Sequence, residues 1–219
     1  MLDRTKEPGA LGEPLYLDIC GALYGKENAP LVIGGRYGLG SKDTTPAQIA
    51  AVFDNLMDVQ PKNHFTIGIE DDVTHHSLAV HPDFPIQTPA GLMQCKFWGL
   101  GSDGTVGANK QAVKIIGEYA KPYVQGYFSY DSKKSGGLTV SHLRFGDTPI
   151  RSEYLIQEAD YIACHNESFL NSGYDLTEGL KENGIFVLNT QYGAEQIGGK
   201  LPKEMVHALI RKKCTALSD

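Results

Sequence analysis

The sequence predicts an α/β protein: a doubly wound, Rossmann-like and mostly parallel sheet preceded by a partial α/β unit. A glycine-rich turn follows an apolar run at residues 92–98 and leads into a helical pattern. An earlier stretch, residues 31–69, reads as strand, glycine loop, helix and strand. Short apolar runs then alternate with polar loops along the rest of the chain, which is typical of strands in such a sheet.

The composition excludes several classes of function. With 219 residues, 41% of them hydrophobic, the chain can bury one good core or two small ones. A formal net charge of −6 leaves no basic face to displace the counterions of a nucleic acid. The sequence has no signal peptide, long apolar span or basic amphipathic helix. We therefore expect a cytoplasmic protein with no nucleic acid and no membrane as partner.

Neither the cysteines nor the histidines predict a metal site. The four cysteines are scattered singly, and none forms a C-x-x-C pair, so we expect free thiols rather than a zinc or iron–sulfur site. His75, His76 and His81 lie near Asp71 and Asp72, but neither their spacing nor a helical context favours metal binding. We expect these histidines to be solvated or to face a partner.

Residues 1–90 predict the partial α/β unit and a linker. Residues 16–23 could be a strand or a short helix, and their periodicity does not decide. Residues 31–33 predict a strand, and residues 64–69 predict the next one. Together with the helix between them, they form a right-handed crossover unit of a parallel sheet. Residues 70–90 contain three prolines and no sustained period, which indicates a linker.

The helix of this unit has a clear start. Thr45 is placed as its cap, Pro46 lies in the first turn, and Gln48 can close a capping box. Ile49, Val52, Phe53 and Leu56 then form one apolar stripe, which we expect to be buried.

Residues 91–219 predict the main domain. Its elements are a strand at 92–98, a helix at 107–120, strands at 123–130, 138–145, 159–164 and 185–189, and a last helix that begins at Pro202. The helix at 107–120 is expected to bury Ala108, Ala112, Ile115 and Tyr119. In the last helix, Met205, Ala208 and Leu209 form the apolar stripe.

The glycine-rich turn is the first candidate site. Gly99, Gly101 and Gly104 have the G-x-G-x-x-G spacing of a tight turn whose backbone approaches a phosphate at the start of a helix. Free N–H groups and the positive end of the helix dipole would then bind an anion. The alternative is a turn with a purely structural role.

Other candidate residues follow the remaining predicted strands. Ligands of open parallel sheets bind at the carboxyl ends of strands. The chain there offers three further segments at that edge: residues 131–137, His165-Asn166 and residues 189–192. They offer backbone donors, amides, an imidazole and two lysines, which suits a phosphorylated ligand. We predict no catalytic residue, because Ser102 and Ser132 lack an assigned base and Cys164 stands in an apolar run.

Asp131 and its neighbours leave the ligand open. An acid after the second strand suits the ribose hydroxyls of a nicotinamide dinucleotide. Lys133 and Lys134 suit an extra phosphate better, unless both are solvated loop charges. His165 could equally be a ligand residue or a strand-end histidine with internal partners, and Asn166 and Asn189 could be turn formers.

Several long strings resemble pyruvate:ferredoxin (flavodoxin) oxidoreductase. They are residues 2–9, 35–42, 97–110, 130–137 and 140–146. The resemblance spans almost the whole chain but covers only a middle part of that large enzyme. Residues 1–90 resemble the end of its second domain. Residues 91–219 resemble its third domain, the counterpart of the separate gamma subunit of related 2-oxoacid oxidoreductases.

The resemblance implies a function for the complete enzyme. The family oxidatively decarboxylates pyruvate on thiamine diphosphate and releases acetyl-coenzyme A. It passes the electrons through iron–sulfur clusters to ferredoxin or flavodoxin. Thiamine diphosphate, Mg and the clusters would belong to the complete enzyme only, whereas the gamma-like domain would help to hold coenzyme A.

We therefore expect a core segment of such an oxidoreductase, inactive by itself, that partners the other domains and forms a homo-oligomer. Gly101, Ser102, Gly104, Thr105 and Gly107 would present backbone donors to the pyrophosphate of coenzyme A. Lys133 and Lys134 would meet its ribose phosphate, and Asn166 and Asn189 would orient the rest. The alternatives are a free-standing nucleotide or coenzyme A binding module and a small NAD(P)-dependent oxidoreductase.

Overall fold

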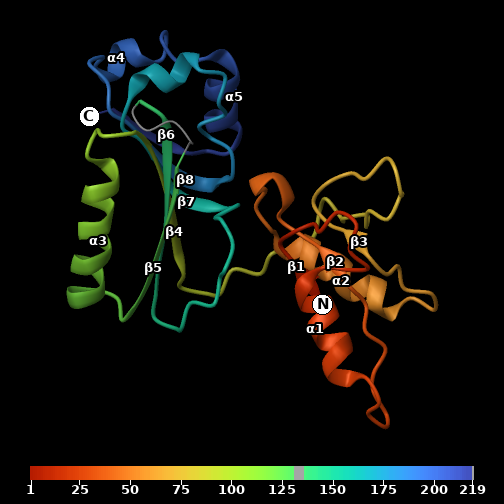
Figure 1. The fold of residues 1–219 in the computed structure, drawn as a ribbon. Helices are drawn as coiled ribbons and strands as arrows, with labels where there is room; N and C mark the ends of the chain where they lie inside the picture. Colours follow the sequence, from red (N-terminus) through yellow and green to blue (C-terminus); the bar gives the residue numbers. More distant parts are fainter. Residues whose placement is uncertain (131–135, 219) are drawn as a thin grey trace. The chain divides into compact units, whose positions relative to one another are not determined.

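The computed structural model describes residues 1–130 and 136–218. Its internal contacts divide the chain into two compact units, Met1–Gln87 and Thr88–Asp219 (Figure 1). We predicted a boundary at residue 90. None of the described helices is both long and apolar enough to cross a membrane.

The first unit is a small parallel sheet with two helices. Its strands, each of two residues, are β1 (Leu2–Asp3), β2 (Gly35–Arg36) and β3 (Phe65–Thr66), in the order β1-β2-β3. Its two helices are α1 (Pro14–Leu23) and α2 (Pro46–Met57), and the short 3₁₀ turn η1 (Leu39–Ser41) lies between them in the chain. The β2-α2-β3 crossover confirms the predicted parallel unit. The first strand of that unit lies at β2, however, rather than at residues 31–33.

The start of α2 is confirmed, whereas its predicted stripe is not. The backbone N–H of Gln48 donates to Thr45 Oγ1 at 3.3 Å, and Gln48 Oε1 accepts from the Thr45 N–H at 3.4 Å. Val52 packs into the core of this unit, but Phe53 is 63% exposed and Leu56 is 45% exposed. The small three-stranded sheet has too little surface to cover the whole stripe.

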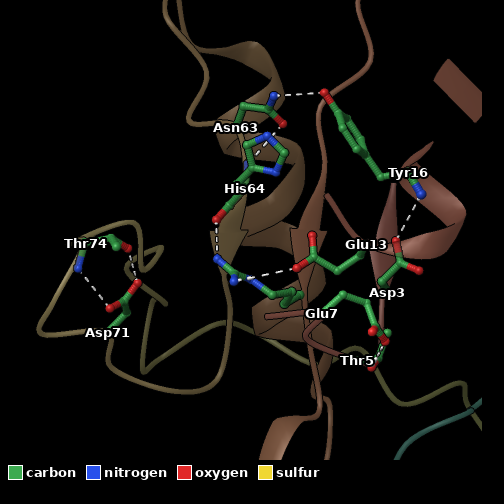
Figure 2. A network of polar contacts seen from close by, with 10 residues as sticks. Asp3, Thr5, Glu7, Glu13, Tyr16, Asn63, His64, Asp71 and Thr74 are labelled. Atoms are coloured by element: carbon green, nitrogen blue, oxygen red, sulfur yellow. Dashed lines mark hydrogen bonds and ion pairs between the residues drawn. The ribbon is translucent and has the colours of Figure 1, made fainter. Parts of the chain in front are cut away.

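A buried polar network fixes α1 as a helix (Figure 2). The Asp3 carboxylate accepts hydrogen bonds from the first-turn N–H groups of Leu15 and Tyr16, at 3.0 and 3.2 Å. Glu13, just before the helix, pairs with Arg36 at 3.6 Å. An acid at a helix N-terminus satisfies donors that would otherwise be unpaired. Because the cap comes from the distant residue Asp3, the local periodicity of residues 16–23 could not reveal this helix.

The second unit has a six-stranded sheet with the order β5-β6-β4-β7-β8-β9. Its strands are β4 (Met93–Leu100), β5 (Tyr123–Tyr130), β6 (Leu138–Gly146), β7 (Ala159–Cys164), β8 (Leu180–Leu188) and β9 (Thr215–Ser218). Its helices are α3 (Thr105–Tyr119), the 3₁₀ helix η2 (Glu167–Asn171), α4 (Ala194–Ile197) and α5 (Lys203–Arg211). All strands run in one direction except β6, which is antiparallel to β4 and β5. The predicted mostly parallel α/β sheet is therefore confirmed.

Some strands differ from the predicted ones. The chain between β5 and β6, residues 131–137, is too short for a parallel crossover, which needs a dozen residues or more. The reversal of β6 follows from that length. Strand β8 begins at Leu180 and runs through Asn183 and Gly184, where we expected a turn; a register shift against β7 accommodates them. Strand β9 and helix α4 were not predicted.

The core of the second unit lies on both faces of the sheet. Trp98, Ile162, Phe186, Met205 and Leu209 belong to one cluster, which confirms the stripe predicted for α5. On the other face α3 (green in Figure 1) packs along β5 and β6.

The buried face of α3 differs from the predicted one. Its buried residues are Thr105 and Asn109, while Ile115 is 48% exposed and Tyr119 is 82% exposed. Hydrophobic periodicity cannot predict this face, because the buried residues in the first two turns of α3 are polar.

Candidate functional site

The glycine-rich turn has a conformation that depends on two of its glycines. A Cβ atom on Gly99 would lie 2.6 Å from Thr105 Cβ, so glycine allows α3 to approach β4. Gly104 is the N-cap of α3 with φ +91°, in the left-handed region that favours glycine. The helix consequently begins at Thr105, two residues before the predicted start at Gly107.

Asp103 occupies part of the expected anion site. Its carboxylate accepts hydrogen bonds from the backbone N–H groups of Leu100, at 2.7 Å, and Thr105, at 2.8 Å. Partial burial raises the pKa of Asp103, but these hydrogen bonds, that of the Thr105 hydroxyl and the charge of His165 together lower it below its ordinary value. The turn therefore carries its own negative charge.

Two of the five predicted backbone donors are used within the protein. The Thr105 N–H donates to Asp103, and the Gly101 N–H donates to Gly137 O at 2.7 Å. Within residues 1–130 and 136–218, nothing accepts a hydrogen bond from the N–H groups of Ser102, Gly104 or Gly107. Among the described residues, therefore, these three donors have no acceptor.

His165 connects several strand ends at the carboxyl edge, the edge of the sheet at which every strand except β6 ends. The ring Nδ1 of His165 lies 2.9 Å from Thr105 Oγ1. The backbone N–H of His165 donates to Trp98 O at 2.9 Å. Its carbonyl accepts from Asn189 Nδ2 at 3.3 Å, and its ring lies 5.9 Å from that of Phe97. The structure thus brings Thr105 and Asn189, both predicted site residues, into contact with His165.

The two predicted asparagines have local roles. Asn166 is the N-cap of η2, where its Oδ1 accepts from the Ser168 N–H at 3.0 Å. The backbone N–H of Asn189 donates to Cys164 O at 2.9 Å, while its side-chain amide contacts His165. Both residues therefore have internal partners that shape this edge.

The predicted lysines lie outside the described residues. Lys133 and Lys134 belong to residues 131–135, as do Asp131 and Ser132. The flanking strands β5 and β6 meet the carboxyl edge at Tyr130 and Leu138, and Gly137 bonds to Gly101. The described chain directly after the lysine segment thus reaches the glycine-rich turn.

We did not predict a buried basic cluster on β4 and β6, which lies on the face of the sheet opposite to α3. Lys96, His142 and Arg144 are each less than 7% exposed. Lys96 Nζ donates to Glu178 O at 3.0 Å, and His142 Nδ1 accepts from the Ile156 N–H at 3.2 Å. Burial is the main cause that lowers the pKa of all three groups. Charged residues in a strand read as solvent-facing, so the sequence carried no signal for this cluster.

The family comparison agrees with the resemblance found in the sequence. A family model described as "Pyruvate ferredoxin/flavodoxin oxidoreductase" matches residues 94–218. The chain belongs to this family.

Curated members of the family match nearly the whole chain. The pyruvate:ferredoxin oxidoreductase of Moorella thermoacetica is 56% identical over 97% of this chain, which spans 18% of that protein. The pyruvate-flavodoxin oxidoreductase of Enterobacter agglomerans is 54% identical over 94% of this chain and 17% of its own length. That of Trichormus variabilis is 55% identical over 97% of this chain and 18% of its own length. The chain thus spans less than a fifth of these relatives.

Two solved structures are similar to part of this chain. Pyruvate oxidoreductase subunit PORC from Thermotoga maritima has a TM-score of 0.42 and 23% identity, over 51% of this chain and 57% of that one. The gamma subunit of a keto/oxoacid ferredoxin oxidoreductase from Geobacter sulfurreducens has a TM-score of 0.38 and 20% identity, over 58% and 61%.

The described residues do not fit the metal cofactors of the pyruvate ferredoxin/flavodoxin oxidoreductase family. They contain no group of three or more His, Cys, Asp or Glu side chains that could hold a metal ion. Burial raises the pKa of Cys95 to about 12 and is the main cause that raises that of Cys164, whereas a cluster requires thiolates. Cys20 lies in the first unit and Cys214 in the second.

Proposed function

We infer that this chain is the core segment of a pyruvate:ferredoxin (flavodoxin) oxidoreductase and that its second unit helps to bind coenzyme A. The observation that carries this proposal is the set of hydrogen-bond donors at the carboxyl edge of the sheet. The N–H groups of Ser102, Gly104 and Gly107, which no described residue accepts, lie there at the start of α3, beside the His165–Asn189 contact. Such donors, with the helix dipole, favour a phosphorylated ligand.

The charge of Asp103 decides which residues must supply affinity. Its carboxylate carries the same sign as a pyrophosphate and uses two of the turn's donors. The turn alone is therefore a weaker anion site than a glycine motif suggests. Lys133 and Lys134 would supply the opposing charge, and coenzyme A offers them a ribose phosphate.

The complete enzyme would convert pyruvate to acetyl-coenzyme A and pass electrons to ferredoxin or flavodoxin. Other parts of such an enzyme would hold thiamine diphosphate, Mg and the iron–sulfur clusters, because the described residues offer no metal ligand set. This chain would partner those domains within a homo-oligomer. By itself, we expect no turnover with pyruvate, thiamine diphosphate and an electron acceptor, and measurable turnover would overturn the fragment hypothesis.

Isothermal titration calorimetry tests the coenzyme A site. The wild-type chain should bind coenzyme A more tightly than 3′-dephospho-coenzyme A. The double variant Lys133→Ala plus Lys134→Ala should lose this preference. A matched control, Lys26→Ala plus Lys42→Ala, removes two exposed charges from the first unit and should keep it. Binding of NADH instead of coenzyme A, abolished by Asp131→Ala, would favour the NAD(P)-dependent alternative.

A further inference from the structure

Buried polar side chains of α3 and β6 carry atoms to which no described residue forms a hydrogen bond. The atoms are Asn109 Nδ2 in α3 and Thr139 Oγ1 and Ser141 Oγ in β6. Asn109 is 4% exposed, Thr139 is 5% exposed and Ser141 is 0% exposed. A buried polar group without a partner costs stability, and folded proteins pair almost all such groups with protein or with ordered water. These atoms therefore indicate a partner other than a described residue.

The two hydroxyls lie on the face of β6 that α3 covers. Side chains two residues apart in a strand point to the same face, so Thr139 and Ser141 share the face of Leu143. Leu143 packs in one cluster with Val113 of α3. The side chains of Thr139 and Ser141 thus face the helix, not the opposite side of the sheet.

The first turn of α3 lies at the level of Thr139. A Cβ atom on Gly99 would lie against Thr105, and Gly99 pairs with Thr139 in the β4–β6 ladder. Asn109 follows Thr105 by four residues, which places it on the same face of the helix about 6 Å further along. Asn109 is therefore the next residue of α3 to face the sheet.

Val113 marks the following turn of the helix. A Cβ atom on Gly126 would lie 3.4 Å from Val113 Cγ2, and Gly126 pairs with Leu143 in the β5–β6 ladder. The helix thus runs along β6 and advances one turn for every two residues of the strand. Asn109 lies one turn before Val113, as Ser141 lies two residues before Leu143. The Asn109 amide and the Ser141 hydroxyl are therefore at the same level.

The geometry points to a binding site for ordered water between α3 and β6, formed by Asn109, Thr139 and Ser141. Water can bridge these side chains because it both donates and accepts hydrogen bonds, whichever way the Asn109 amide is turned. A bridging water joins polar atoms up to about 5.5 Å apart. Successive residues on one face of a strand are about 7 Å apart. One or two water molecules therefore suffice.

A metal ion or a larger ligand fits this site less well. Its three side chains are neutral, and the described residues contain no group of three or more His, Cys, Asp or Glu side chains that could hold a metal ion. All three side chains are almost fully buried, so a larger molecule could not reach them unless α3 moved. Water is the polar partner that is small enough.

The inference goes beyond the proposed function, because it does not depend on coenzyme A. It concerns how α3 packs on the sheet. The buried residues in the first two turns of α3 are Thr105 and Asn109, both polar. Water bound at Asn109 would let this polar part of the helix pack on β6 without leaving its amide unpaired.

A high-resolution crystal structure of the wild-type chain tests the site directly. We expect ordered water at about 2.7–3.2 Å from at least two of the atoms Asn109 Nδ2, Thr139 Oγ1 and Ser141 Oγ. Electron density that shows these atoms without water, or paired with other protein groups, would overturn the inference.

Removal of the hydroxyls gives a second test, in which a hydrated and a dry site have opposite signs. Thr139→Val keeps the shape of the side chain without its hydroxyl, and Ser141→Ala removes the neighbouring one. In a hydrated site each variant deprives the water of a partner, so the melting temperature should fall by about 2–4 °C. A rise in both variants would mean that unpaired groups had been removed, which contradicts the site. The matched control is Thr215→Val, at an exposed position of β9, which should change the melting temperature little.

The double variant shows whether the two hydroxyls share the site. Thr139→Val plus Ser141→Ala should lower the melting temperature by less than the sum of the two single effects, because the first substitution already disturbs the shared water. Additive effects would overturn a shared site. If a variant does not fold, the wild-type crystal structure decides.

Discussion

Arg144 and Gln94 face each other across β6 and β4, and Arg144 Nε donates to Gln94 Oε1 at 2.9 Å. The guanidinium is 1% exposed, yet its other acceptors are also neutral: Gln125 Oε1, Ser152 O and Tyr154 O. A buried cation is costly unless its donors are satisfied. Here the guanidinium of Arg144, in β6, links the segment after β6 to strands β4 and β5 through hydrogen bonds.

Replacing Arg144 should therefore destabilise the second unit. Arg144→Met removes the charge but leaves four acceptors without their donor, and each unsatisfied buried group costs about 1–3 kcal/mol. We expect a loss of roughly 3 kcal/mol or more in the free energy of unfolding, measured by urea denaturation. Arg151→Met, at an exposed position seven residues along the chain, should change it little. Equal stability of the two variants would contradict a structural role for Arg144.

His142 should make folding stability depend on pH. Burial, followed by the charges of Lys96 and Arg144, lowers its pKa from 6.5 to about 4. The folded state thus favours the neutral ring. The resulting stabilisation of the folded state is complete above about pH 6.5. It is lost as the pH falls toward 4, because His142 takes up its proton at a higher pH in the unfolded chain than in the folded one. It amounts to about 3 kcal/mol.

The measurement is urea unfolding of the wild type and of His142→Asn at pH 7 and pH 4.5. Asparagine keeps an acceptor for the Ile156 N–H but cannot titrate. The variant should lose less stability on acidification, whereas His207→Asn should behave as the wild type. An unchanged pH dependence in His142→Asn would show that other groups cause it.

The cysteines should fall into two classes of reactivity. Cys95 and Cys164 are buried, and burial raises the pKa of both thiols, so few thiolates form. Cys20 and Cys214 are partly exposed. Ellman's reagent at pH 8 should therefore titrate two thiols in the folded chain and four in denaturant. The double variant Cys20→Ser plus Cys214→Ser should show almost none when folded, and rapid labelling of that variant would contradict the burial.

Local signals in the sequence predicted those parts of the fold that depend on local interactions. Thr45 and Gln48 form their capping box within four residues, and β7 follows directly from an apolar run. By contrast, α1 depends on a cap from Asp3, and the buried face of α3 begins with Thr105 and Asn109. Hydrophobic periodicity cannot detect a cap from a distant segment or a buried polar face.

The candidate site was predictable in position but not in its hydrogen bonds. The strand ends correctly indicated the edge at which Thr105, His165 and Asn189 meet. The sequence could not show that Asp103 would turn back onto Leu100 and Thr105, because that depends on the turn's actual dihedral angles. It also gave no means of distinguishing His165 in a ligand site from a histidine with only internal partners.

Gly107 offers a test that separates the ligand site from the fold. A Cβ atom there would meet nothing within 4 Å, and alanine favours a helix by up to about 1 kcal/mol over glycine. Gly107→Ala should thus keep or raise the melting temperature while weakening coenzyme A binding, because its methyl group occupies the surface on which the ligand would lie. Gly21→Ala in α1, also free of contacts, should raise stability without affecting binding.

Gly99→Ala provides the opposite case. Its Cβ atom would lie 2.6 Å from Thr105 Cβ, so α3 must move away from β4 and both stability and binding should fall. Overpacking of this kind typically costs about 1–3 kcal/mol. Calorimetric titration with coenzyme A and thermal melting of the three variants distinguish these effects. If Gly107→Ala binds as tightly as the wild type while Gly99→Ala does not, the start of α3 shapes the fold but does not contact the ligand.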